Sequence, residues 1–294
     1  MTDQNPHRLP RKVLPRHYAI TLEPDLNGSS FRGTVAVDVD VIDETDTVVI
    51  NAAELEIESV SVEQNEIFKA SSVVMDEELE RAEFVFPVVL QPGSARLSCS
   101  FKGTLNDKLR GFYRSTWTDE AGQERLIATT QFESTNARRA FPCFDEPDLK
   151  ASFGVTLRVD DSLMAISCGE LVRSTKLDDG RREDTFADTM VMSTYLVAFI
   201  VGELEATDPV DVNGVPLRIV HVPGKGDLTE FGLAAAEFSL RWLVDYYGIP
   251  YPAGKLDLIA VPDFAFGAME NLGCVTFRET LLLSDPERTT QAEL

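Results

Sequence analysis

The sequence predicts a mainly β (α+β) fold, and three observations lead to that prediction. Hydrophobic and polar residues alternate along much of the chain from Val13 to about Glu205, as in strands with one buried and one solvent-exposed face. Clusters of Gly, Pro, Asn and Asp separate these runs. Only one segment, Leu228 to Tyr247, has the spacing of a long amphipathic helix.

The first part of the chain predicts antiparallel strands. Alternation is clearest from 35 to 42, where four valines fall on one face and Ala36, Asp38, Asp40 and Ile42 on the other. Similar runs occupy residues 82–89, 96–101, 152–159 and 190–201. Turn sequences occur at 27–28, 91–93 and 178–180.

The pattern changes after about Thr207. Asn213-Gly214 predicts a hairpin turn into a strand over 215–222, which residues 223–226 end. The predicted helix follows. Six of its apolar residues fall on one face: Phe231, Ala234, Ala235, Phe238, Trp242 and Tyr246.

Gly248 and Pro250 end that helix. A buried strand is predicted at 256–261, with further strands at 274–277 and 280–283. We place a domain boundary near residue 205, which gives domains of residues 1–205 and 206–294.

Charge and composition narrow the function classes. The chain has 294 residues, 49 acidic against 27 basic, with a formal net charge of -22. Binding to a nucleic-acid backbone or an anionic membrane is therefore opposed electrostatically. No apolar run is long enough to span a membrane, and the N-terminus has no apolar signal region. The four cysteines show no CxxC spacing, which favours reduced thiols and a cytoplasmic protein.

Four short motifs carry the functional information. They are GFYRS at 111–115, TQFE at 130–133, ARRAFPCFDEP at 137–147 and GAMEN at 267–271. In content and order they resemble the aminopeptidase N family of zinc exopeptidases, which includes the puromycin-sensitive aminopeptidases. The resemblance implies a β-saddle N-terminal domain followed by the β-rich first lobe of a thermolysin-like catalytic domain.

The family's zinc ligands have no match here. Those enzymes hold zinc with an HExxH helix and a later glutamate beyond GAMEN, whereas the only histidines in this chain are His7, His17 and His221. A helical two-histidine site needs partners four residues apart, and none of these has one. We expect an N-terminal portion that ends before the metal-binding helix, has no catalytic residue or metal ligand of its own, and is inactive alone.

Recognition of a peptide's free N-terminus is what the resemblance assigns to this chain. An exopeptidase needs carboxylates that bind the α-ammonium group at a fixed distance from the metal, because charge-assisted hydrogen bonds contribute about 1.5 to 3 kcal/mol each. By resemblance these carboxylates are Glu133 and Glu270.

The remaining candidate residues surround those two. Gly267 and Ala268 are small and would let a substrate backbone approach the strand edge. Met269 and Asn271 complete the motif, and by resemblance Gln131 and Phe266 line the pocket for the first substrate side chain. An ordinary turn, strand or core role would give the same residue types at these positions.

Other conspicuous residues are expected to be structural. Arg138, Arg139, Asp145 and Glu146 predict an ion-pair and loop network. Cys143 is expected to be a small buried side chain without thiolate activation. His221 is expected to be an ordinary strand histidine.

Three functions remain open at this point. The first is the N-terminal portion of a zinc aminopeptidase acting on peptides with a free N-terminus. The second is a non-catalytic homologue that binds peptides or proteins, and the third is an epoxide-hydrolysing relative. The sequence does not define side-chain preference or oligomeric state.

Overall fold

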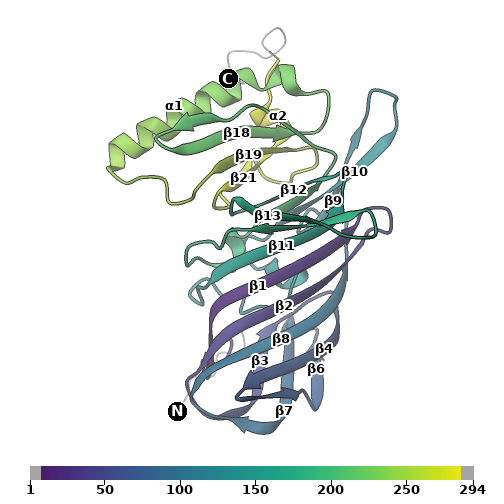
Figure 1. Cartoon of the computed structure of the whole chain (residues 1–294), viewed down its shortest axis with the longest axis vertical. Coiled ribbons are helices and arrows are strands. Elements are labelled where there is room, and N and C mark those ends of the chain that lie inside the picture. Colours follow the sequence, from purple (N-terminus) through teal and green to yellow (C-terminus); the bar gives the residue numbers. More distant parts are fainter. Residues whose placement is uncertain (1–7, 286–294) are drawn as a thin grey trace.

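The computed structural model describes residues 8–285 and is mostly β-structure, which confirms the predicted fold class. Its largest element is an eight-stranded sheet (Figure 1). In spatial order its strands are β13 (Leu171–Lys176), β14 (Arg181–Phe186), β11 (Ser152–Asp160), β1 (Val13–Asp25), β2 (Ser30–Val41), β8 (Gly93–Thr104), β4 (Leu55–Gln64) and β5 (Glu66–Lys69). All neighbours are antiparallel except β1 and β11, which are parallel.

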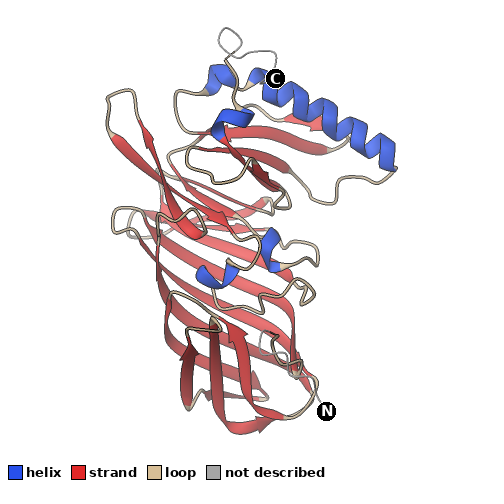
Figure 2. Cartoon of the chain, turned by 180° about the vertical axis from the view of Figure 1, so that it is seen from behind, coloured by secondary structure: helices blue, strands red, loops and turns tan. Residues whose placement is uncertain are grey.

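A smaller sheet covers one end of this large sheet, at the end of the molecule opposite the long helix (Figure 2). Its strands in order are β3 (Thr45–Asn51), β7 (Arg81–Leu90) and β6 (Ser72–Asp76). The alternation predicted around residue 35 is confirmed, because all four valines are buried. They share one hydrophobic core with Phe84 and Phe86 of β7. Burial of that face holds the two sheets together.

A four-stranded sheet lies between the large sheet and the C-terminal part of the chain (Figure 1). Its strands are β12 (Met164–Ser167), β15 (Phe199–Gly202), β10 (Glu124–Gln131) and β9 (Gly111–Thr118). The strand predicted over 190–201 was largely wrong, since only its last residues form β15. Buried hydroxyls hold the preceding segment as a loop, in which Ser193 donates to the Pro147 carbonyl and Thr194 to Asp145.

The C-terminal part is a six-stranded sheet with helices. Its main path is β16 (Glu205–Ala206), β18 (Val215–His221), β19 (Leu256–Val261), β21 (Cys274–Arg278) and β20 (Ala268–Met269), and β17 (Val210–Val212) pairs with β18. The Asn213-Gly214 hairpin is confirmed, and both turn residues have positive φ. Strands β18, β19 and β21 run parallel, and all six residues of β19 are buried.

Helix α1 (Glu230–Tyr247) is confirmed, but its predicted apolar face is not the face that packs. Phe238 is 70% exposed and Tyr246 67% exposed. The side that meets the sheet is the opposite one, where Gly232 and Leu240 are buried. Glycine is needed there, because a Cβ on Gly232 would lie 2.4 Å from the Leu282 carbonyl oxygen.

The other helical elements are short. Helix α2 (Glu279–Leu282) replaces the strand predicted over 280–283, since one helical turn buries Leu282 and leaves Leu281 exposed. The described part of the chain also has three 3-10 turns, η1 (Ala137–Arg139), η2 (Thr194–Leu196) and η3 (Gly226–Leu228).

Candidate functional site

The GAMEN residues lie at an open edge of the six-stranded sheet. Ala268 and Met269 form β20, the edge strand, which pairs with β21 alone among the strands of residues 8–285. Ala268, Glu270 and Phe266 are exposed, and Gly267 is half-buried. The side chains of Met269 and Asn271 are buried instead, so they hold the segment in the fold. The segment thus presents an exposed carboxylate beside a short strand with a free edge.

The second candidate segment follows β10. Gln131 is the last residue of that strand and is buried, yet neither its amide oxygen nor its amide nitrogen has a hydrogen-bond partner among residues 8–285. Such an unpaired buried amide is unusual in a folded protein. Glu133 lies two residues later and is exposed, and its peptide bond to Ser134 is cis. Its main-chain carbonyl accepts a hydrogen bond from the Asn136 side chain, at 3.3 Å.

Both segments are attached to the same piece of chain, residues 195–199. The buried Asn271 amide donates to the main-chain carbonyls of Tyr195 and Val197, each at 3.4 Å. The amide N–H of Phe199 donates to the hydroxyl of Thr130, at 3.3 Å, next to Gln131. Residues 195–199 therefore connect the end of β10 to the end of the GAMEN segment.

The two candidate carboxylates are both available for a ligand. Neither Glu133 nor Glu270 makes a side-chain hydrogen bond or ion pair with any residue in the described range. Most acidic side chains nearer the core are paired, as Asp263 and Glu279 illustrate. An exposed, unpaired carboxylate can bind a cationic group without first breaking an internal contact.

Comparison with known proteins identifies the family. Residues 14–196 match the model of the peptidase M1 N-terminal domain, and residues 231–294 match the peptidase family M1 domain. The chain belongs to the peptidase M1 family. The predicted resemblance is thereby confirmed.

Curated relatives agree with this family assignment. The chain is 44% identical over 286 residues to the puromycin-sensitive aminopeptidase of Caenorhabditis elegans. The aligned region covers 96% of this chain and 30% of that protein. It is 41% identical over 288 residues to the alanine/arginine aminopeptidase of Saccharomyces cerevisiae, covering 96% and 33%. The human endoplasmic reticulum aminopeptidase 1 is 38% identical over 291 residues, covering 97% and 31%. The M1 chain thus spans about a third of the length of these relatives.

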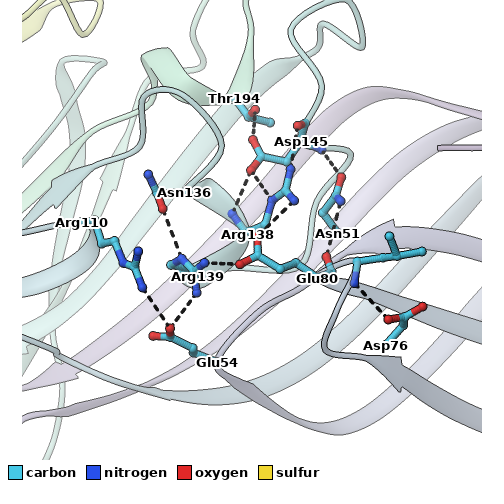
Figure 3. Close-up of polar contacts among 11 residues, drawn as sticks. Asn51, Glu54, Asp76, Glu80, Arg110, Asn136, Arg138, Arg139, Asp145 and Thr194 are labelled. Atoms are coloured by element: carbon cyan, nitrogen blue, oxygen red, sulfur yellow. Dashed lines mark hydrogen bonds and ion pairs between the residues drawn. The ribbon is translucent and has the colours of Figure 1, made fainter. Parts of the chain in front are cut away.

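The network predicted around residues 137–147 of this M1 chain is confirmed (Figure 3). Arg138 pairs with the buried Asp145 at 3.0 Å and with Glu80 at 3.3 Å. Arg139 pairs with Glu54 at 2.7 Å and also with Glu80. Glu54 directly precedes β4 of the large sheet, and Glu80 directly precedes β7 of the three-stranded sheet. These ion pairs therefore fasten the starts of both strands to the η1 turn that follows β10.

The same network reaches the loop that carries Glu133. The Arg139 guanidinium donates to the Asn136 side-chain oxygen at 3.1 Å (Figure 3), and Asn136 in turn donates to the Glu133 carbonyl. Glu146 has a separate role, since its carboxylate pairs with Arg8 and Arg11 and so holds the start of the described chain.

Cys143 and His221 have the structural roles predicted for them. Cys143 is fully buried, and burial raises the pKa of its thiol well above the ordinary value. A ring nitrogen of the buried His221 lies 2.8 Å from the carbonyl oxygen of Val222.

Residues 8–285 contain no group of three or more His, Cys, Asp or Glu side chains placed to hold a metal ion. No helix in the described range is long and apolar enough to cross a membrane. An open apolar groove of about 1240 Å³ lies between α1, α2 and the six-stranded sheet. None of the candidate site residues lines it.

Proposed function

We propose that this chain is the amine-recognising, N-terminal portion of a zinc-dependent M1 aminopeptidase. In this proposal Glu133 and Glu270 bind the α-ammonium group of a peptide with a free N-terminus. The observation that supports it most is that both carboxylates are exposed and unpaired among the described residues, on segments fastened to the same residues 195–199.

The chemistry of an ammonium group fits two carboxylates well. It has three N–H donors, so each carboxylate can accept one charge-assisted hydrogen bond, and each such bond contributes about 1.5 to 3 kcal/mol. An acetylated N-terminus has no positive charge and only one N–H. Selectivity for free amines is therefore the property that this pair would provide.

The neighbouring residues complete the proposed site. The free edge of β20 suits main-chain hydrogen bonds to an extended peptide, and Ala268 leaves room for it. The unpaired amide of Gln131 and the exposed ring of Phe266 suit the first substrate side chain. Met269 and Asn271 contribute by holding Glu270 in place.

Zinc enters the proposal through the family. In a zinc peptidase the metal polarises the scissile carbonyl and lowers the pKa of its bound water. The residues described here supply no ligand set for it, so we infer that amine recognition and metal chemistry are contributed by different parts of the parent enzyme. The 294-residue chain should release no amine from an aminoacyl chromogenic substrate.

Two further proposals concern organisation and location. We infer the domain boundary near residue 205, because a second hydrophobic core is built only from residues between 212 and 283. We also propose a cytoplasmic location, since all four cysteines are buried and free.

A titration with small ligands tests the amine site directly. Leucinamide, which has a free amine, is titrated into the 294-residue chain and followed by NMR, with N-acetyl-leucinamide as the uncharged comparison. We expect leucinamide to bind and the acetylated compound to bind at least about tenfold more weakly. Glu133→Gln and Glu270→Gln should each remove most of that difference.

A matched control separates local contact from general charge. Glu77→Gln removes the same charge from an exposed glutamate in the turn between β6 and β7, and should leave leucinamide binding unchanged. Equal affinity for the two ligands in the wild-type chain would overturn the proposal. So would equal effects of Glu77→Gln and Glu270→Gln.

A further inference from the structure

Strand β9, which begins with the GFYRS motif, is hydrogen-bonded to Asp263 in the C-terminal part of the chain. Three residues of β9 donate hydrogen bonds to Asp263: Tyr113, Ser115 and Thr116. Asp263 lies in the loop between β19 and β20, about 150 positions later in the sequence. The sequence indicates no partner for the GFYRS motif, because only the fold brings it against Asp263.

The contact consists of five hydrogen bonds. One carboxylate oxygen of Asp263 accepts from the Thr116 amide at 2.8 Å, the Thr116 hydroxyl at 3.0 Å and the Ser115 hydroxyl at 3.3 Å. The Asp263 amide donates to the Ser115 hydroxyl at 2.9 Å. The Tyr113 hydroxyl donates to the Asp263 carbonyl at 2.9 Å. Side chain and main chain of Asp263 are thus both held.

The donors themselves are fixed by burial. Tyr113 and Ser115 are fully buried. Burial, and after it the nearby charge of Asp263, raises the pKa of Tyr113, so its hydroxyl stays protonated and able to donate. The Asp263 carboxylate is only partly buried, but it is charged, so each hydrogen bond that it accepts is stronger than one between neutral groups.

The loop after Asp263 is fastened from its other side by Arg278. The Arg278 guanidinium donates to the carbonyls of Phe264 at 3.2 Å and Ala265 at 2.7 Å. Its amide donates to the Gly267 carbonyl at 2.9 Å. The path from Asp263 to the first GAMEN residue therefore has little freedom to move.

Strand β9 connects this contact to the other candidate segment. It pairs with β10 along its whole length, with Tyr113 opposite Thr129 and Gly111 opposite Gln131. Two residues after Gln131 the chain reaches Glu133. Asp263 thus ties the segment carrying Glu270 to the hairpin whose end carries Glu133.

We propose that Asp263 is a positioning residue that sets the separation of Glu133 and Glu270 and thereby the affinity for a free amine. This inference rests on the proposed function. Asp263 acts through the two glutamates and does not itself touch the ligand.

The test uses the same leucinamide titration with changes at the contact. Asp263→Ala should weaken leucinamide binding about tenfold, which corresponds to about 1.4 kcal/mol, because the carboxylates lose their fixed spacing. Asp263→Asn should bind more tightly than Asp263→Ala, since its amide oxygen can still accept from the Thr116 amide. Thr116→Val removes only one hydroxyl and gives a milder variant that keeps the fold.

Asp119→Ala is the matched control. Asp119 lies in the turn of the same β9–β10 hairpin. Its carboxylate accepts three hydrogen bonds, from Ala121, Gln123 and Arg125, and none of these residues belongs to the C-terminal sheet. The Asp119→Ala variant should have lower thermal stability, but its affinity for leucinamide should be unchanged at temperatures well below unfolding.

The outcomes separate the two levels of inference. A wild-type chain that does not bind leucinamide overturns the proposed function and this inference with it. A wild-type chain that binds, together with Asp263→Ala and Asp119→Ala variants that bind equally well, overturns the positioning role alone. The positioning role is supported if Asp263→Ala binds leucinamide more weakly than the wild-type chain, and if adding Thr116→Val to Asp263→Ala causes no further loss of affinity.

Discussion

Gly273 lies directly against the main-chain carbonyl oxygen of Cys168, so that a Cβ added to Gly273 would be 2.3 Å from that oxygen. Cys168 follows β12 of the four-stranded sheet, and Gly273 precedes β21 of the six-stranded sheet. The two sheets therefore approach through bare backbone at this point, just after the GAMEN segment. Gly273 also has a φ of 72°, which favours glycine for a second reason.

Replacing Gly273 with alanine should strongly destabilise the chain. The left-handed conformation alone costs about 1 to 2 kcal/mol for alanine, and the clash with backbone atoms adds to it. We expect a loss of about 3 kcal/mol in the free energy of unfolding, measured by urea denaturation.

Gly248→Ala provides the comparison for that measurement. Gly248 ends α1 with a φ of 64°, and nothing lies within 4 Å of its added Cβ. It should therefore show the conformational cost alone, about 1 to 2 kcal/mol. Equal losses for the two variants would mean that the sheets can move apart freely near Gly273.

Asp145 should be essential for stability, unlike its neighbour Asp148. Asp145 is almost fully buried and accepts hydrogen bonds from the Arg138 guanidinium at 3.0 Å and the Thr194 hydroxyl at 2.6 Å (Figure 3). Asp145→Ala leaves a largely buried arginine without its main partner, so we expect a loss of about 3 to 5 kcal/mol. Thermal or urea unfolding measures this directly.

Asp148→Ala tests whether burial is the cause. Its carboxylate is 56% exposed and pairs with Arg8 and Arg11, both partly solvent-exposed. Exposed pairs contribute about 0 to 1 kcal/mol, so this variant should be close to wild type. A loss as large as that of Asp145→Ala would contradict the account.

The four thiols should be unreactive in the folded chain. Burial raises the pKa of Cys168 to about 11 and of Cys99 to about 12, and raises the pKa of Cys143 and Cys274 as well. Only about one thiol in a thousand is ionised at pH 8 when the pKa is about 11, and the thiolate is the reactive form. A chromogenic disulfide reagent at pH 8 should therefore detect no thiol until urea is added. Rapid release of even one equivalent from the native chain would refute this.

Strands could be predicted where buried and exposed residues alternate within the strand itself. In β2 each second residue faces the core, so the valines could be assigned to one face without knowledge of the partner strands. The prediction of a strand over 280–283, where the structure has helix α2, was wrong for the opposite reason. A run of four residues such as 280–283 is compatible with a strand or a helical turn, and only packing against β19 and α1 decides between them.

The long helix shows a second limit. Its apolar residues occur on both sides, so periodicity established the helix but did not determine which face packs. Candidate residues 267–271 could be named from a motif, whereas the contacts that fasten them could not. Asp263 bonds to residues about 150 positions away, and such pairings leave no local pattern in one sequence.

The Asp38–Arg96 pair should contribute stability that disappears in acid. Two hydrogen bonds from the Arg96 guanidinium, at 2.7 and 2.9 Å, link β8 to β2. They are the main cause of the lowered pKa of Asp38, with smaller contributions from the charges of Arg96, His17 and Arg16. Since the folded state lowers this pKa, the contribution is complete above the unfolded pKa of about 3.9 and is lost as pH falls through the lower folded value.

Arg96→Gln tests this sign by urea unfolding at several pH values. Both side chains are partly exposed, so the variant should be less stable by about 0.2 to 1 kcal/mol at pH 7. The difference should remain at pH 5, begin to shrink as pH falls through the unfolded pKa of about 3.9, and disappear once pH is below the lower folded pKa of Asp38. A difference that stayed constant from pH 7 to pH 2.5 would show that Arg96 acts through packing of its aliphatic stem and not through the Asp38 charge.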